Sequence, residues 1–345
     1  MSVSQVYKSD TRMMARIKAL LERVDITLDE HLDYTCAVFD EEGQPIATGS
    51  AFGSTLRCFA VDPAHQGEGL LNEVITHLME DRLNRGYFHL FVYTKPGSAK
   101  FFKDLGFSQI AEVPGILVFL ENRKNGFSAF LKKLESFRQP GQSAAIVMNA
   151  NPFTRGHRYL IELAARENDA VHLFILSENA GPIPAKIRQR LVREGVADLP
   201  NVICHETGEY LISSATFPGY FLKSEEKILR TQALLDTALF VQIAKALDIT
   251  VRYVGHEPHS LVTALYNDVL SETLPNHGIQ CRIVPRKHLS DDRVISASAV
   301  RQAIHDGCLE EVADMLPETT LNYFRSPEAT PIIAAIRREK DVVHY

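Results

Sequence analysis

The chain of 345 residues has room for about two domains of ~150 residues, and its 45% hydrophobic and 23% charged residues are typical of a globular protein. Its net charge of −6 argues against a general nucleic-acid or membrane-surface binder, although a local cluster of cations would suffice for a small polyanion. No apolar run approaches the ~18 residues of a spanning helix, and the first twenty residues lack the apolar core of a signal peptide. The five cysteines are scattered without metal-ligand spacing, so we expect a cytoplasmic protein with buried, reduced thiols.

The first half of the chain predicts a mixed α+β domain. Its expected elements are a helix, a run of strands joined by a Glu-Gly turn, a second helix, a strand and a short helix, at residues 8–24, 34–63, 70–86, 89–94 and 98–107. A polar, basic stretch then ends in Pro140-Gly141, as a linker or a bridging helix would. We therefore expect domains at residues 1–140 and 141–345.

The second half alternates strictly between strands and helices. Strands are expected at 144–149, 170–176, 201–205, 250–255 and 280–285, and helices at 157–167, 186–196, 224–247, 260–274 and 297–304. Strands alternating with helices of this length indicate an α/β fold with a doubly wound parallel sheet. Ligands of such sheets bind at the carboxyl ends of the strands.

A loop with two glycines, Gln66 to Gly69, lies between a strand and a helix of the first half. Glycines let backbone N–H groups approach an anion and the helix N-terminus adds positive charge, although an ordinary turn would have the same composition. The segment VDPAHQGEGLLNEVITHL resembles the acyl-CoA-binding signature of the GNAT acetyltransferase superfamily, and SAKFFKDLGF resembles its next motif. This resemblance implies a CoA-like, pantetheine-binding site at Val61, Gln66, Gly67, Glu68, Gly69 and Leu70.

The same half departs from the acetyltransferase pattern in three ways. Leu71 stands where the signature has a small residue, and Phe101 and Phe102 stand in place of a tyrosine acid. The strand STLRCFAV carries no carboxylate to accept a proton from an amine. We therefore expect this domain to bind a pantetheine thiol and to be poorly equipped to catalyse acetyl transfer on its own.

The segment NPFTRGH, residues 151–157, follows the first strand of the second half. Gly156 would allow a phosphate to approach the backbone, while Thr154 and His157 would stabilise charge on an α-phosphorus. These three residues resemble the T/H-x-G-H signature of the nucleotidyltransferase superfamily. Taken alone, His157 could equally be a histidine that caps the following helix.

A second signature further along the chain supports the first. VISASAVRQAI resembles the I-S-x-S/T-x-x-R motif of the same superfamily, and its first serine is also a natural helix N-cap. Hydroxyls, a helix N-terminus and an arginine together suit β- and γ-phosphates. We expect catalytic roles for His157, Thr154 and Arg301, and ATP contacts from Asn151, Phe153, Gly156, Arg188, Gly255, Glu257, Ser296 and Ser298.

Several charged side chains have two interpretations. Lys186 and Arg188 could add positive charge to the ATP site or lie on a solvated helix face. Glu257 could orient a ribose or bind Mg²⁺, or it could supply charge near a helix N-terminus. Asp236 could be a metal-linked carboxylate, but a salt bridge is the favoured interpretation.

Binding of a CoA-like thiol and cleavage of ATP are the two activities that an acid–thiol ligase needs. The whole chain resembles the citrate lyase ligases through VMNANPFTRGHRYLIE, SSATFPGYF, YVGHEP and ISASAVR. That resemblance implies activation of acetate by ATP and Mg²⁺ as acetyl-adenylate. It also implies acetylation of the phosphoribosyl-dephospho-CoA thiol on the acyl carrier (gamma) subunit of citrate lyase, with no nucleic-acid or membrane partner.

Two other functions fit part of this pattern. An adenylyltransferase with an acyl-CoA-sensing N-terminal domain would take a phosphate acceptor, and it would need further basic residues near the NPFTRGH loop, where only Arg155 and Arg158 are evident. A CoA or nucleotide sensor would need no turnover, and the presence of both nucleotidyltransferase signatures argues against it.

Overall fold

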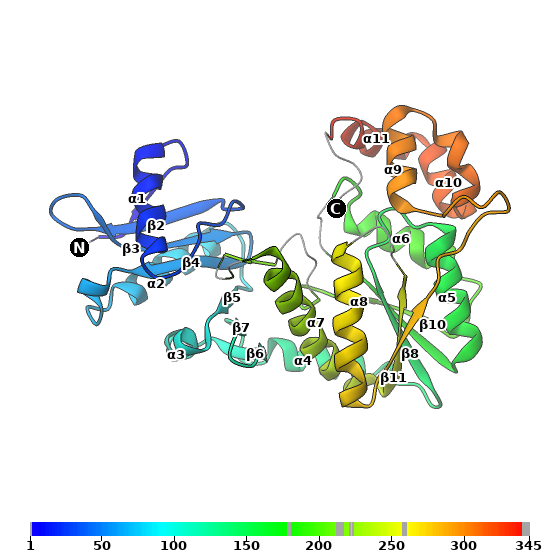
Figure 1. Cartoon of the computed structure of the whole chain (residues 1–345), viewed down its shortest axis with the longest axis horizontal. Coiled ribbons are helices and arrows are strands. Elements are labelled where there is room, and N and C mark those ends of the chain that lie inside the picture. Colours follow the sequence, from blue (N-terminus) through cyan, green and yellow to red (C-terminus); the bar gives the residue numbers. More distant parts are fainter. Residues whose placement is uncertain are drawn as a thin grey trace. The chain divides into compact units, whose positions relative to one another are not determined.

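The computed structural model describes residues 2–177, 181–211, 217–220, 222, 224–256 and 261–339 (Figure 1). The chain forms two compact units. The first unit comprises Met1–Ala129 and Pro218–Thr231, and the second comprises Phe130–Phe217 and Gln232–Tyr345. A segment from the second half of the sequence therefore returns to the first unit, and helix α7 (Glu225–Leu247) begins in one unit and ends in the other.

The first unit is built on a mixed sheet of order β1-β2-β3-β4-β5-β7-β6. Neighbouring strands are antiparallel except β4 and β5, which are parallel. Its principal elements are β1 (Ser4–Gln5), α1 (Thr11–Glu22), β2 (Tyr34–Phe39), β3 (Pro45–Phe52), β4 (Thr55–Val61), α2 (Leu70–Asn84), β5 (Phe91–Thr94), α3 (Ala99–Asp104), β6 (Ser108–Val113) and β7 (Leu117–Glu121). The expected helices and strands are present, and the hairpin β6–β7 was not expected from the sequence.

A bulge in β4 separates it from β5. The register between β3 and β4 shifts at Gly49, which faces both Cys58 and Phe59, and Cys58 has a positive φ of 53°. A β-carbon on Gly49 would lie 2.6 Å from Cγ1 of Val74, so helix α2 packs directly against the bulge. Bulges bend a strand and increase its twist. Consequently β4 and β5 pair only near their N-terminal ends, and the rest of β4 diverges from its parallel neighbour.

The second unit is a doubly wound sheet, as expected from the sequence. Its principal elements are α4 (Gly126–Glu135), β8 (Ser143–Met148), α5 (Arg155–Glu167), β9 (Ala170–Ile175), α6 (Ala185–Gly195), β10 (Val202–Glu206), α7, β11 (Ile249–Gly255), α8 (Leu261–Thr273), β12 (Gln280–Val284), α9 (Ala297–Asp306), α10 (Glu318–Arg325) and α11 (Thr330–Ile336). Helices α10 and α11 lie beyond the elements expected from the sequence.

All neighbouring strands of this sheet are parallel, in the order β10-β9-β8-β11-β12. Helices α5 and α6 pack on one face, and α7 and α8 pack on the other with α4 (Figure 1). The chain reverses its winding between β8 and β11, so a crevice opens there at the carboxyl ends of the strands. The NPFTRGH segment follows β8 and therefore lies at this crevice.

The five cysteines are all unpaired, and Cys36 and Cys58 are fully buried. Burial raises the pKa of each of these two thiols to about 12, so both stay protonated near neutral pH. Within the described ranges, none of the helices combines the length and hydropathy needed to cross a bilayer.

Two candidate binding cavities

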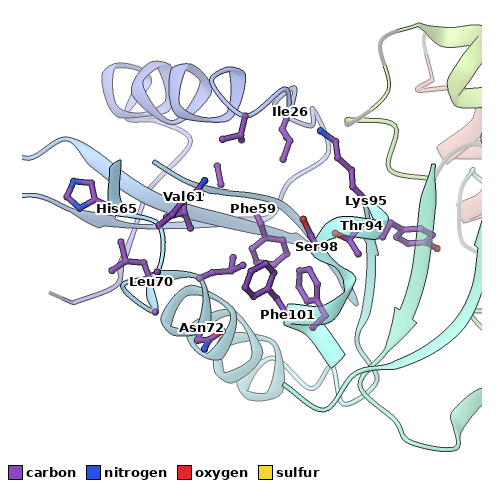
Figure 2. Close-up of a pocket in the computed structure, with 18 of the residues that line it drawn as sticks. Ile26, Phe59, Val61, His65, Leu70, Asn72, Thr94, Lys95, Ser98 and Phe101 are labelled. Atoms are coloured by element: carbon purple, nitrogen blue, oxygen red, sulfur yellow. The ribbon is translucent and has the colours of Figure 1, made fainter. Parts of the chain in front are cut away.

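A cavity of about 690 Å³ opens where β4 and β5 diverge in the first unit (Figure 2). Strand β4, the loop before α2, the end of β5 and helix α3 form most of its wall. In Figure 2, His65 and Leu70 lie toward one end of the cavity, and Thr94 and Lys95 lie toward the other. Of the residues expected to bind a CoA-like ligand, the wall contains Val61, Gln66, Gly67, Gly69 and Leu70.

The glycine loop has a backbone that other residues rarely adopt. Gly67 and Gly69 have φ values of 89° and 79°, and a β-carbon on either would meet no atom within 4 Å. Gly69 is the N-cap of α2, so the first N–H groups of a 15-residue helix face the open space beside it. Glu68 is not part of the wall, and its carboxylate contacts His65, with 3.1 Å between Oε1 and Nδ1.

The departures from the acetyltransferase pattern leave the cavity apolar around its middle. Leu71, Phe101 and Phe102 all line it, and no carboxylate is found among the described residues of its wall. Two phenols, Tyr93 and Tyr220, line it as well. Sequence reasoning assigned no role to either: Tyr93 lies in an expected strand, and Tyr220, although part of the SSATFPGYF segment, comes from the other half of the chain.

A second cavity, of about 370 Å³, lies at the crevice of the parallel sheet in the second unit. The carboxyl ends of β8, β11 and β12 and the first residues of α5 and α9 surround it. Of the residues expected to bind ATP or act on it, the wall contains Thr154, Gly156, His157, Gly255 and Ser296. Two helix N-termini thus meet at one cavity, and both favour a negatively charged ligand.

His157 is fixed by the helix cap that it completes. Its Nδ1 accepts a hydrogen bond from the Thr154 backbone N–H at 3.1 Å and lies 2.9 Å from Thr154 Oγ1. Burial, with smaller contributions from the positive charges of Arg286 and Arg301, lowers the pKa of His157 from 6.5 to about 4. The imidazole is therefore neutral near pH 7, and because Nδ1 is an acceptor, its proton is on Nε2.

Helix α9 presents two hydroxyls at its N-terminus. Ser296 is the N-cap and accepts a hydrogen bond from the Ala299 N–H, and its Oγ lies 2.6 Å from Oγ of Ser298. Ile295 packs against the first turn of α5, since a β-carbon on Gly156 would lie 3.4 Å from its Cγ2. A larger side chain at Gly156 would therefore push the two helix N-termini apart.

The expected ATP-binding Arg188 and the expected catalytic Arg301 both hold the loop that precedes α5. Arg188 Nη1 donates to the Asn149 carbonyl, and Arg301 Nη1 donates to the Asn151 carbonyl at 2.5 Å. Both arginines are buried and neither lines the cavity. The same loop contains Ala150 at a positive φ of 51°, a conformation that costs a non-glycine residue about 1–3 kcal/mol. The arginines therefore stabilise a strained loop backbone.

The remaining expected residues have varied positions. Phe153 is fully buried and stacks against the His157 ring, with 6.1 Å between centroids. The side-chain amide of Asn151 is buried, and its two polar atoms have no hydrogen-bond partner within the described part of the chain. Lys186 is exposed on α6. Glu257 lies outside the described residues.

Three cations that the sequence motifs did not indicate line the second cavity: Arg252, Arg286 and Lys287. Arg252 is buried and forms an ion pair with Asp236, with 3.0 Å between Nη1 and Oδ2, so Asp236 has the salt bridge favoured for it above. The position of Arg286 and Lys287 just after β12 was the available signal, because every strand of a parallel sheet ends at the ligand side.

A mixed sheet with a glycine-loop cavity, joined to a doubly wound sheet with both nucleotidyltransferase signatures, defines a two-unit enzyme of acetyltransferase-like and nucleotidyltransferase-like parts. The family model of the citrate lyase ligase C-terminal domain matches residues 143–324. The chain is 37% identical to the [citrate [pro-3S]-lyase] ligase of Escherichia coli (strain K12), over 94% of this chain and 93% of that one. It is 35% identical to the [citrate [pro-3S]-lyase] ligase of Haemophilus influenzae, over 92% and 96% of the two chains.

The chain therefore belongs to the citrate lyase ligase family and is a ligase. Among solved structures, the first unit is similar to a GNAT family N-acetyltransferase, YhbS, from Escherichia coli in complex with CoA. That likeness has 17% identity and a TM-score of 0.28, and covers 36% of this chain and 82% of the other.

Proposed function

We propose that this protein activates acetate with ATP and transfers the acetyl group to the thiol of a CoA-like prosthetic group on the acyl carrier subunit of citrate lyase. In the first step, a carboxylate oxygen of acetate attacks the α-phosphorus, the α–β phosphoanhydride bond breaks, and pyrophosphate leaves. In the second, the thiol sulfur attacks the acetyl carbonyl carbon, AMP leaves, and the thiol proton passes to solvent. The products are AMP, pyrophosphate and an acetyl thioester.

The observation that carries the first step is the hydrogen bond from the Thr154 backbone N–H to Nδ1 of His157, which assigns the imidazole proton to Nε2. A neutral imidazole with its proton on Nε2, in the wall of a cavity at the switch point of a parallel sheet, is a fixed donor for charge that develops on an α-phosphate. Thr154 and Ser296 are the N-caps of α5 and α9, the two helices that begin at the same cavity. The chain itself attacks nothing, since positioning and charge stabilisation suffice for this transfer.

The cations of the second cavity suit a leaving pyrophosphate. Arg286 and Lys287 line the wall from one side, and Arg252 lines it from strand β11. No carboxylate occurs among the described residues of this wall, so these residues offer no Mg²⁺ site of their own. We propose that ATP enters as its Mg²⁺ complex, because Mg²⁺ is commonly held by substrate phosphates and water.

The first cavity supports the second step. Within the described part of the chain, β4 pairs with β5 only at Thr55 and Leu56, so we propose that the backbone N–H and C=O groups beyond the bulge bind the ligand. The two amides of a pantetheine arm can pair with such an edge as an added strand would. The glycine loop at the N-terminus of α2 suits the pyrophosphate of a CoA-like group. Unpaired cysteines throughout also suit the reducing cytoplasm as the place of action.

A phosphate acceptor, as in a nucleotide adenylyltransferase, is the alternative for the same ATP cavity. The two arginines noted earlier do not supply its site, because Arg155 donates to the Leu316 carbonyl and Arg158 is paired with Glu162 and Asp198. Arg286 and Lys287 are present in either case. The two functions are therefore separated by the acceptor that drives ATP cleavage.

ATP–pyrophosphate exchange measured with a panel of small acids tests the proposal. We expect exchange that requires acetate and increases with its concentration, with weaker exchange for propionate and formate. The full reaction should form AMP and a thioester only when a carrier thiol is added. An exchange rate that does not depend on any carboxylic acid but increases with a phosphorylated acceptor, such as phosphopantetheine, would refute the proposal and support the adenylyltransferase.

A further inference from the structure

One wall of the first cavity comes from a distant part of the sequence. Tyr220 lines this cavity, and it belongs to the segment Pro218–Thr231 that returns to the first unit. Its backbone carbonyl accepts a hydrogen bond from the Thr27 N–H at 2.7 Å, and its hydroxyl donates to the Tyr93 carbonyl at 3.3 Å. Tyr220 is therefore fixed between the loop after α1 and strand β5.

These contacts place Tyr220 at the end of the cavity away from the glycine loop. Its partner Tyr93 is on β5, beside Thr94 and Lys95, and Figure 2 shows these last two at the opposite end from His65. An extended ligand whose pyrophosphate lies at the glycine loop would reach Tyr220 with its far end. For a CoA-like molecule, that end is the thiol.

We propose that Tyr220 closes the thiol end of this cavity and positions the pantetheine arm, so that the arm's site is complete only when the second half of the chain contributes this residue. The inference rests on the proposed function, because it assumes a pantetheine thiol as the ligand. The ring is 8% exposed, so it acts mainly as an apolar wall. Burial raises the pKa of the Tyr220 phenol, which keeps the hydroxyl protonated and able to donate to Tyr93.

Tyr220 should affect only one of the two steps, the acetyl transfer to the thiol. Tyr220 precedes helix α7, which begins in the first unit and ends in the core of the second. Tyr220 nevertheless lines only the first cavity and is not among the residues that line the second. Loss of Tyr220 should impair acetyl transfer while leaving ATP–pyrophosphate exchange unchanged.

Binding of dephospho-CoA to full-length variants tests this inference. Tyr220→Ala removes a buried ring and should weaken binding about tenfold or more, whereas Tyr220→Phe keeps the wall and should weaken it by about threefold at most. Tyr7→Ala is the matched control, because Tyr7 belongs to the same unit and is 63% exposed. All three variants should retain acetate-dependent exchange, and unchanged circular dichroism and thermal unfolding of the full-length variants would show that the first unit is still folded.

The chain contains no tryptophan, so a single introduced indole gives a second, independent measurement. Fluorescence of Tyr220→Trp should change on titration with dephospho-CoA, and that of Tyr7→Trp should not. If the wild-type protein binds dephospho-CoA and Tyr220→Ala binds it equally well, or if the indole at position 220 does not respond, the inference is wrong and the proposed function stands. If the wild-type protein fails to bind dephospho-CoA at all, the proposed thiol site itself is wrong.

Discussion

His157 has two roles that a substitution can separate. Its Nδ1 completes the cap of α5, and its Nε2–H is the proposed donor to the α-phosphate. We expect His157→Ala to reduce acetate-dependent ATP–pyrophosphate exchange at least about a hundredfold, because loss of one such donor costs on the order of 3 kcal/mol. Glutamine at the third helical position can also complete a capping box, so His157→Gln should keep the thermal stability that the alanine variant loses. Near-normal exchange in a folded His157→Ala protein would show that the residue is only a cap.

The low pKa of His157 also gives folding a pH dependence. Burial lowers the pKa of His157 and of His172 to about 4, and that of His205 to about 3. Below pH 6.5 each histidine binds a proton in the unfolded chain before it does so in the folded one, so stability falls as the pH decreases. Each should cost up to about 1.4 kcal/mol of unfolding free energy per pH unit between 6.5 and the folded pKa.

Denaturant unfolding at pH 7.0 and 5.5 measures this loss. His172→Gln should show a shallower pH dependence, because it removes one titrating group while glutamine still offers a hydrogen bond to His205, whose Nε2 lies 2.9 Å from His172 Nδ1. Equal stability of the wild-type protein at the two pH values would contradict the assignment of neutral, buried histidines.

The ion pair of Arg252 and Asp236 is a second place where single residues decide stability. Both side chains are 3% exposed, and the guanidinium also lies 4.3 Å from the Phe240 ring centroid. Arg252→Met leaves the Asp236 charge buried without its partner, which typically costs about 3–5 kcal/mol. The double variant Arg252→Met/Asp236→Leu removes both charges and should recover most of that loss. If urea unfolding finds the double variant as unstable as the single one, packing rather than charge accounts for the effect.

At the scale of elements, the loop from Gln66 to Gly69 leads to a testable prediction about ligand binding. Gly69 has a φ of 79°, where an L side chain costs about 1–2 kcal/mol, and its β-carbon would extend into the proposed anion site. Gly69→Ala should therefore weaken dephospho-CoA binding and slow transfer to the thiol, with ATP–pyrophosphate exchange unchanged. Gly97→Ala is the control, because Gly97 also has open space around its α-carbon but no positive φ. Full transfer activity in Gly69→Ala would mean that this loop is only a turn.

The helices and strands were largely predictable from the sequence. The features that were not predictable depend on how strands and helices from different parts of the chain pack together. Apolar spacing located every strand and helix from β8 to α9, since each has a long periodic pattern bounded by turns. The bulge at Cys58 has no such pattern, because it depends on Gly49 packing against α2 from another part of the chain. The motif residues that line the second cavity, Thr154, Gly156, His157 and Ser296, were equally predictable. Arg286 and Lys287 belong to no motif, and their position just after the predicted strand at 280–285 was the one sequence signal for them.

At the scale of the whole molecule, the return of one segment to the first unit is the feature that sequence alone did not indicate. A boundary near residue 140 follows from composition, yet Pro218–Thr231 belongs with Met1–Ala129. Nothing local marks Tyr220 as part of a cavity in the first unit, because its hydrogen-bond partners Thr27 and Tyr93 are 193 and 127 residues away along the chain. Contacts at such separations depend on the tertiary fold, so periodicity and motifs carry no trace of them.

The division of the chain into two units determines which shortened protein can separate adenylation from acetyl transfer. The adenylation sheet, β8 to β12, and both phosphate signatures belong to the second unit, and a unit of this size can bury its own core. A protein that starts at Ser143 would nevertheless lose helix α4, whose Phe130, Leu131 and Leu134 pack into the core with α7 and α8. Each lost apolar side chain can cost about 1.5–3 kcal/mol, so this version should unfold at a clearly lower temperature.

A protein that starts at Asn125 keeps α4 and is the better test. We expect it to catalyse acetate-dependent ATP–pyrophosphate exchange at a rate close to that of the full chain, because the proposed adenylation residues are all retained. It should fail to acetylate the carrier at low carrier concentration, since the glycine loop and the β4 edge are missing and proximity alone can be worth several kcal/mol. Adding residues 1–124 as a separate chain should restore little, because Tyr220 would then have to find Thr27 and Tyr93 between two molecules. The measurement is carrier thioester formed by the shortened and full-length proteins at matched exchange rates. If the shortened protein acetylates the carrier as fast as the intact one, the first unit does not contain the thiol site, and the assignment of thiol binding to the first unit and adenylation to the second is wrong.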